Sequence, residues 1–385
     1  MNLSKKLLSL SFVAVFATAC VDVFKADYDL NTNLLTVEGI LTNQPTSTIR
    51  VRQSRSNRFS ITSEAVQKCV VEVKAGDGTL IALRETAPGD YTTPLGFSPK
   101  QGESYQLRLQ TPTGQRYEST AEVFRAVPEI AKVYDKFNAK GILDRKGIEV
   151  FSSSFDVFVD FQDTPRPRDL YFWTAKLYER QPICATCTGY FNAFTKQCVN
   201  VNIKGILIPD FDYKCDGACW EIISLSDINL LSDSYSNGQQ IIGRPVARVP
   251  FYSEEGCLVE ISQYNISEGA YRFFSIVREQ SQTTGTLADV PPSPAFGNIT
   301  NTNEPTDRLV GYFGVGGVKQ VRHWINRTGY ATQGKKISLL GRELLYEAQQ
   351  RPSYIPFVEG EIRPPFAPCV NSSSRTPFKP QGWRN

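Results

Sequence analysis

Histidine is nearly absent from this chain, which contains one, His323, among 385 residues. Ser-His-Asp and Cys-His catalytic sites both use a histidine as the base, and catalytic zinc sites usually use about two or three histidines as ligands. His323 lies beside Trp324 in an alternating stretch, which is typical of a side chain packed on a strand. We therefore expect His323 to be structural. The sequence predicts a protein that is not an enzyme, with no catalytic residues, no bound metal and no cofactor.

An excess of charge of one sign is also missing. The formal net charge is +3. Residues 1–19 contain Lys5, Lys6 and no acidic residue, so without them 40 basic residues (42 − 2) stand against 39 acidic ones, a net charge of +1. Nucleic-acid binding needs clustered Lys and Arg. No basic run occurs, and we expect no nucleic-acid partner.

Long hydrophobic runs are lacking as well. A membrane-spanning helix needs about 20 apolar residues. The apolar run at residues 7–16 is shorter than this, and no later run approaches that length. A membrane attachment would therefore have to be made by lipid.

The amino terminus has the pattern of a bacterial lipoprotein signal. Lys5 and Lys6 precede the apolar run, and small residues at 17–19 stand directly before Cys20. This pattern predicts that residues 1–19 are removed and that Cys20 carries acyl chains such as palmitate, with residues 20–32 as a lipidated tether. Each buried methylene contributes about 0.8 kcal/mol, and two or more chains give stable anchoring. The alternative is plain secretion, with Cys20 as an ordinary thiol.

Residues 33–125 carry repeated strand signals. Cys69, Val71 and Val73 form one face of a strand that a turn at 76–78 follows. Tyr105, Leu107 and Leu109 alternate with polar residues, and a turn follows at 112–114. Short strands at this spacing, without a helical stretch between them, are typical of an immunoglobulin-like β-sandwich of roughly 100 residues.

Residues 126–360 are predicted to form a larger β-rich domain with one or few helices. Residues 155–161, 170–178 and 258–264 read as strands. One helix is expected after Asn265, because Asn265 and Glu268 have the spacing of a capping box and an apolar stripe follows. That stripe consists of Ala270, Phe273, Phe274 and Val277. Residues 361–385 lack periodicity and are predicted to form an extended tail, pinned through Cys369.

Eight cysteines remain after Cys20, and five of them fall in a segment at 182–220 with little apolar content. Four of these, Cys184, Cys187, Cys215 and Cys219, have a spacing that also suits zinc. Export favours disulfides instead, because thiols are not kept reduced outside the cytoplasm. Each bridge would contribute about 2–4 kcal/mol. The disulfide candidates are Cys69, Cys184, Cys187, Cys198, Cys215, Cys219, Cys257 and Cys369. Eight cysteines allow on the order of a hundred connectivities, so no pair is assigned.

Other motifs carry weaker signals. The glycines at 311–317 resemble a nucleotide loop but do not lie between a strand and a helix, so glycines that let a strand bend are the favoured interpretation. Two groups of residues with side-chain oxygens could suit calcium, but the first misses the EF-hand spacing and solvated loop residues are the more common finding in both cases. They are Asp210, Asp212 and Asp216 in one group, and Asp227, Asp233 and Asn237 in the other.

Several ordered motifs resemble one family. Within residues 262–318 they are Gln263, the Ser-Glu-Gly-Ala-Tyr run at 267–271, Gly-Thr-Leu-Ala-Asp at 285–289, the proline pair at 291–292, Gly297-Asn298 and Gly-Tyr-Phe at 311–313. Cys215, Cys219 and Trp220, and an early strand at 35–42, also match. The chain is similar to the domain of unknown function 4249 (DUF4249), a family of Bacteroidota lipoproteins. The tail departs from the pattern, since Cys369 stands there alone.

The resemblance implies a location more than a chemistry. It implies an outer-membrane lipoprotein, facing the cell surface or the periplasm, that is associated as an accessory or ligand-binding subunit with a TonB-dependent receptor or another barrel protein. The family supplies no catalytic residues to transfer. An alternative is a structural subunit of a larger outer-membrane assembly or secretion complex. A hydrolase based on two carboxylates is a third possibility, for which no particular pair of acids stands out.

Overall fold

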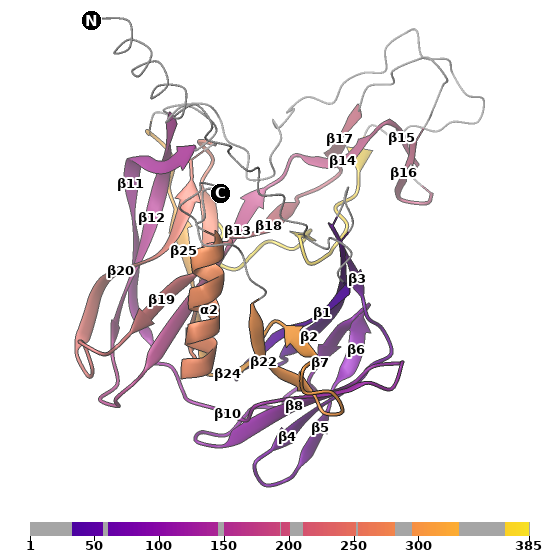
Figure 1. Cartoon of the computed structure of the whole chain (residues 1–385). Helices are drawn as coiled ribbons and strands as arrows, with labels where there is room; N and C mark the ends of the chain where they lie inside the picture. The colour runs from indigo at the N-terminus through magenta and orange to yellow at the C-terminus, as the bar shows by residue number, and fades with distance from the viewer. Residues whose placement is uncertain are drawn as a thin grey trace, which may run out of the picture.

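The computed structural model describes residues 33–56, 61–144, 150–192, 194–200, 211–251, 253–281, 295–330 and 366–384. Apart from one helix, α2 (Glu268–Ser281), the elements in these ranges are strands, which confirms the prediction of a mainly β protein. Figure 1 shows the strands in two large groups, with α2 on the second group and a smaller set of strands extending from it. The helix in the described ranges lacks the length and apolar character of a membrane-crossing segment.

The first group is a sandwich made from one long sheet that folds over itself. Its strands from the amino-terminal region are β1 (Asn33–Leu41), β2 (Thr48–Ser56), β3 (Ile61–Ala65), β4 (Val70–Ala75), β5 (Leu80–Ala82), β6 (Arg84–Ala87), β7 (Asp90–Thr92), β8 (Ser104–Gln110), β9 (Arg116–Ser119) and β10 (Glu122–Val123). In β8 the predicted alternation is present, because Tyr105, Leu107 and Leu109 are buried between half-buried polar residues. They pack with Val37 of β1 and Val51 of β2 in one core. Full burial of each such side chain stabilises the fold by about 1.5–3 kcal/mol.

Three strands from much later in the chain complete this sandwich. They are β22 (Phe296–Asn301), β23 (Arg308–Val310) and β24 (Phe313–Val315). β22 and β23 lie between β9 and β1, and β24 runs parallel to β1. Gly311 allows this close approach: its φ is +104°, and a Cβ there would lie 2.2 Å from the Val37 carbonyl oxygen. The first sandwich therefore takes strands from outside residues 33–125.

The second group is a sandwich of two sheets. One sheet contains β11 (Ile130–Asp144), β12 (Val150–Gln162) and β20 (Gln240–Pro250). The other contains β13 (Leu170–Arg180), β18 (Trp220–Ser224), β19 (Asn229–Ser232), β21 (Cys257–Asn265), β25 (Val318–Ile325) and β27 (Arg375–Thr376). Inward side chains of β12 and β13, among them Phe161, Tyr171 and Trp173, are fully buried and share one core.

Helix α2 covers the outer face of β13 and reaches the first sandwich. Phe274 stacks on Phe172 with ring centroids 4.5 Å apart, and Phe273 packs on Tyr312, which follows β23. The predicted cap at Asn265 is wrong. The Ser267 hydroxyl accepts the Ala270 amide at 3.1 Å, whereas Asn265 is buried at the end of β21 and donates to Asp169.

The predicted cysteine-rich segment is a small set of strands held by disulfides. Its strands are β14 (Ile183–Cys187), β15 (Gly189–Asn192), β16 (Gln197–Asn200), β17 (Phe211–Cys215) and β26 (Phe366–Ala367). The bridges are Cys184–Cys215, Cys187–Cys198 and Cys219–Cys369. The disulfide interpretation is confirmed for these six cysteines, so their sulfurs are not thiolates available to zinc.

The prediction that all eight cysteines form disulfides is wrong for Cys69 and Cys257, which are free thiols. Cys69 packs against the core of the first sandwich, and Cys257 is fully buried in the core of the second. Because the two sulfurs lie at the cores of different sandwiches, they cannot form a bridge with each other.

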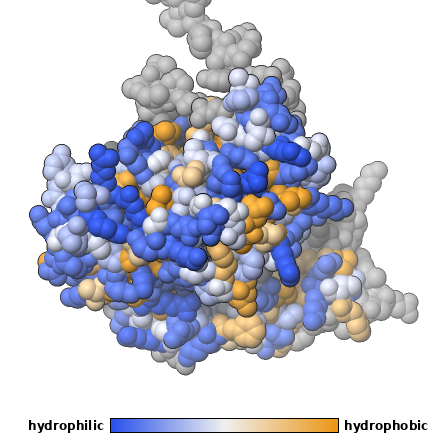
Figure 2. Space-filling model, turned by 90° about the horizontal axis from the view of Figure 1, so that it is seen from below, coloured by the Kyte–Doolittle hydropathy of each residue, from blue (hydrophilic) through white to orange (hydrophobic). Residues whose placement is uncertain are grey.

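The tail crosses the outer face of the second sandwich. β27 pairs with β18, and Trp383 packs edge-on against Trp220 and Trp324. The predicted anchoring through Cys369 is present as the bridge to Cys219. Hydrophobic side chains are otherwise mostly internal. Figure 2 shows that the face seen from below is predominantly hydrophilic, with smaller hydrophobic areas interspersed.

Candidate functional site

Three buried aspartates meet where β12 ends and β13 begins. Asp163, Asp169 and Asp233 expose 2%, 0% and 1% of their surface, and one oxygen of each lies within 4.8 Å of the others. The sequence singled out Asp233 but not Asp163 or Asp169. Asp163 and Asp169 flank the segment Thr-Pro-Arg-Pro-Arg, which is a turn signal without any pattern of acid spacing.

The carboxylate oxygens of this cluster hold the ends of strands together. Asp163 accepts hydrogen bonds from the Tyr171 hydroxyl and from the Gly238 amide, the latter at 2.9 Å. Asp233 accepts the Asp169 amide at 2.9 Å, and Asp169 accepts the Asn265 side-chain amide at 2.9 Å. Burial, and then the hydrogen bond to Asp163, raises the pKa of Tyr171, so its hydroxyl remains a donor. These contacts give the cluster an architectural role.

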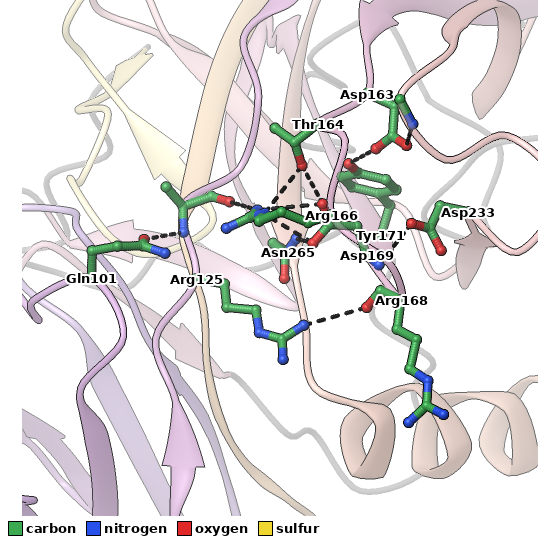
Figure 3. A network of polar contacts seen from close by, with 12 residues as sticks. Gln101, Arg125, Asp163, Thr164, Arg166, Arg168, Asp169, Tyr171, Asp233 and Asn265 are labelled. Atoms are coloured by element: carbon green, nitrogen blue, oxygen red, sulfur yellow. Dashed lines mark hydrogen bonds and ion pairs between the residues drawn. The ribbon is translucent and has the colours of Figure 1, made fainter.

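The cluster lies against a turn that contains two arginines, Arg166 and Arg168. Arg166 pairs with Asp169 and also donates to the Ala126 carbonyl at 3.2 Å. Ala126 belongs to the link between the two sandwiches, so Arg166 connects this link to the aspartate cluster. Arg168 has a left-handed backbone with φ of 69°, and its carbonyl accepts Arg125 Nη1 at 3.4 Å. Figure 3 shows the Arg168 side chain extending away from the aspartates toward the helix, with Arg125 beside it.

A cleft of about 610 Å³ lies beyond these arginines. It separates the first sandwich at β10 from the second sandwich at the start of β13, the end of β19 and the first turn of α2. Its lining is Ala121, Glu122, Val123, Arg125, Arg168, Leu170, Ser232, Ser234, Ile266, Ser267, Glu268, Tyr271 and Arg272. Clefts of this size at the junction of two domains commonly bind small ligands.

The cleft contains more positive than negative charge. Three arginines and two glutamates line it, which gives a formal charge of +1 (3 − 2). Glu268 is paired with Arg272, whose hydrogen bond lowers the pKa of that carboxyl. Glu122 is buried and accepts the Tyr312 hydroxyl at 2.6 Å and the Asn298 amide at 3.1 Å. In the described part of the chain, Arg125 and Arg168 form no ion pair with a carboxylate.

The other residues singled out from the sequence lie elsewhere. Asp212 is buried on β17 and accepts the Thr186 hydroxyl at 2.6 Å, while Asp216, Asp227 and Asn237 are exposed. His323 Nε2 lies 2.6 Å from Asp135 Oδ1, between β25 and β11. Cys20 and Asp210 lie outside the described residues. Of these residues, the ones that the structure describes do not line the cleft.

A family model described as "Domain of unknown function (DUF4249)" matches residues 21–322. The chain belongs to this family. Searches among curated proteins and among solved structures give no match.

The motif residues of this DUF4249 protein support its architecture. Gln263 accepts the Trp173 indole N–H at 2.9 Å and donates to the Pro128 carbonyl at 3.0 Å, so it connects the core to the inter-sandwich link. The Asn298 side chain donates to the Phe313 carbonyl at 2.9 Å and accepts the Phe313 amide at 3.0 Å. Residues 267–271 form the first turn of α2 and one wall of the cleft.

The arginines of the cleft are what sequence reasoning missed. Arg125 and Arg168 are 43 residues apart and neither lies in a regular spacing with Arg272. Only the fold brings them together, because the inter-sandwich link and the β12–β13 turn meet at the aspartate cluster. Near Arg168, the sole local sequence signal is the pair of prolines at 165 and 167, which indicates a turn.

Proposed function

We propose that this protein is a non-enzymatic outer-membrane lipoprotein that binds a ligand and acts as an accessory subunit beside a TonB-dependent transporter. The observation that carries the proposal is the open cleft between the two sandwiches, in which two of the three arginines, Arg125 and Arg168, form no ion pair with a carboxylate of the described ranges. The sequence of the amino terminus supports lipid anchoring at Cys20, and membership of the DUF4249 family is consistent with it.

The arrangement suits a binding subunit physically. A lipid anchor keeps the protein in the plane of the membrane and raises its effective concentration near a barrel without a large interface. The cluster of three carboxylates, Asp163, Asp169 and Asp233, is buried and accepts hydrogen bonds from its surroundings. This favours binding over carboxylate-based hydrolysis, which needs accessible acids about 5–10 Å apart.

The proposal is tested by copurification. Affinity-tagged protein is isolated from detergent-solubilised outer membrane of the native cell, and copurified proteins are identified by mass spectrometry. We expect an acylated Cys20 and a stoichiometric TonB-dependent barrel protein. The variant Cys20→Ser is the control and should lose both the acyl chains and the membrane fractionation. Recovery of acylated protein without any barrel would contradict the partnership.

The alternative is a structural subunit of a larger outer-membrane assembly. It is favoured by the covalent attachment of the tail through Cys219–Cys369 and by the return of β22–β24 to the first sandwich. Both features stiffen the molecule. Under this alternative the same copurification yields several different envelope proteins together, and no small molecule binds the purified protein.

A further inference from the structure

The cleft between the two sandwiches has the chemistry of an anion site. Arg125 comes from the link between the sandwiches, Arg168 from the β12–β13 turn and Arg272 from α2. Arg272 is engaged by Glu268, whereas the exposed Arg125 and Arg168 form no ion pair with a carboxylate in the described chain. Arg168 is still close enough to Glu268 to help lower the pKa of that carboxyl through its charge. A guanidinium presents its N–H groups in a planar fork that matches a carboxylate or a phosphate.

The guanidinium of Arg125 and the backbone of Arg168 are held in place. The carbonyl of Arg168 accepts the Arg125 guanidinium, so the two chain segments are tied side by side. The neighbouring Arg166 is fixed by Asp169, which is fully buried, and by the Ala126 carbonyl. The left-handed backbone of Arg168 is unusual for a residue with a side chain and often marks a functional position.

The other residues that line the cleft indicate which chemical groups the ligand would carry besides its anionic group. Ser232 and Ser234 supply hydroxyl groups, and the amino-terminal end of α2 contributes a favourable dipole for an anion. Leu170, Ile266 and the half-buried ring of Tyr271 form an apolar side. An anion with only oxygens would leave this side without contact. A ring with both polar and apolar faces would use it.

We propose that this cleft binds a small organic anion of monosaccharide size, which presents a phosphate or carboxylate group to Arg125 and Arg168 and its ring to Tyr271. A volume of about 610 Å³ accommodates a ligand of this size. The inference rests on the proposed ligand-binding function and names the class of its ligand. Because ionic contacts in an open cleft are screened by salt, affinity should fall as the salt concentration rises.

The test is calorimetric titration of the full-length acylated protein in detergent, with its disulfides intact. The probes are glucose 6-phosphate, glucuronate, inorganic phosphate and neutral glucose. We expect glucose 6-phosphate or glucuronate to bind more tightly than inorganic phosphate and glucose. Tighter binding of glucose 6-phosphate would indicate phosphate recognition, and tighter binding of glucuronate would indicate carboxylate recognition. If neither acid binds at millimolar concentration, or if glucose binds equally well, the inference is overturned.

Variants link the binding to the cleft. Arg168→Gln and Arg125→Gln should each weaken the binding about tenfold or more, since each removes a charge-assisted hydrogen-bonding group. Arg168→Lys keeps the charge but not the fork and should give a smaller loss. Arg116→Gln removes an exposed arginine on β9, outside the cleft; it is the matched control and should bind as the unaltered protein does. Thermal melting checks that each variant is folded. Equal losses in Arg116→Gln and Arg168→Gln would contradict the assignment.

The outcome is separable from that of the copurification. Anion binding without a copurified barrel protein would support the assignment of the cleft and contradict the proposed association with a transporter. A copurified barrel together with unchanged anion affinity in the double variant Arg125→Gln/Arg168→Gln would overturn the cleft assignment alone.

Discussion

Arg327 is fully buried and pairs with Glu179 through two hydrogen bonds, at 2.9 and 3.2 Å. Its guanidinium also donates to the Pro250 and Glu255 carbonyls. Taking both charges out of water is costly, and this bidentate pairing offsets the cost only while both partners are present. The ion pair therefore makes the second sandwich sensitive to the loss of either side chain.

We predict that Glu179→Ala destabilises the protein by about 3–5 kcal/mol, because it leaves the Arg327 charge buried without its counterion. The double variant Glu179→Ala/Arg327→Met should recover a large part of this loss. Urea unfolding followed by tryptophan fluorescence measures both. Arg55→Ala, which removes an exposed pair with Glu64, is the surface control and should change the stability by less than about 1 kcal/mol. A double variant no more stable than Glu179→Ala would show that the ion pair is not the cause.

The two free thiols should differ in reactivity for a physical reason. Burial raises the pKa of Cys257 well above its ordinary value, and burial also raises the pKa of the half-buried Cys69. The thiolate is the reactive form, so a raised pKa means less reaction at any pH below it.

We predict that iodoacetamide at pH 8 leaves Cys257 unlabelled in the folded protein and labels Cys69 slowly, at a rate that increases as the pH rises. In urea without reductant, both should label fully while the six bridged cysteines do not. Peptide mass spectrometry identifies the sites. Labelling of Cys257 in the folded state would contradict its enclosure in the second core.

At the scale of elements, the sequence predicted the strands well where one face is buried. The alternation at Tyr105, Leu107 and Leu109 appears as expected, since a period of two specifies which face is internal. The strands predicted at 155–161 and 170–178 are also present, as parts of β12 and β13 in the two different sheets of the second sandwich. The helix was also found, but its cap was assigned to Asn265. Asn, Ser and Asp are all good caps, so the sequence alone could not tell that Asn265 is held by Asp169 and that Ser267 is free to cap.

Disulfide pairing could not be predicted because it depends on distance in the fold. Cys219 and Cys369 are separated by 150 residues and meet only because the tail crosses the second sandwich. Cys69 and Cys257 looked like any other pair of candidates in the sequence, yet they lie at the cores of different sandwiches.

We predict that Cys369→Ser releases the tail and costs about 2–5 kcal/mol, because this bridge closes a long loop. The loss of Trp383 from between Trp220 and Trp324 should change the tryptophan fluorescence, and trypsin should cleave after Arg375. Cys187→Ser is the comparison, since its bridge to Cys198 closes a loop of separation 11 and should contribute less. An unchanged fluorescence spectrum in Cys369→Ser would mean that the tail stays bound without its bridge.

At the scale of the whole molecule, the two sandwiches are joined by more than the link near residue 126. Tyr312 packs on α2, and Gln263 of the second sandwich holds the Pro128 carbonyl of the link. Local patterns in the sequence give no sign of this, because β22–β24 pair with strands more than 170 residues earlier. For the same reason the cleft and its arginines emerge only from the assembled fold.

This interlocking predicts that residues 33–125 do not fold as an independent unit. Without β22 and β23, the facing edges of β9 and β1 are left unpaired, and Phe313 and Ile299, both fully buried in the first core, are missing. Unpaired edges and an exposed core promote aggregation. We expect a 33–125 fragment to be insoluble or to give no cooperative melting transition. A fragment of the same strands with residues 295–316 attached after residue 125 through a flexible linker should show a cooperative transition by circular dichroism. A cooperative transition in the shorter fragment would mean that the first sandwich folds without β22–β24, which would contradict this prediction.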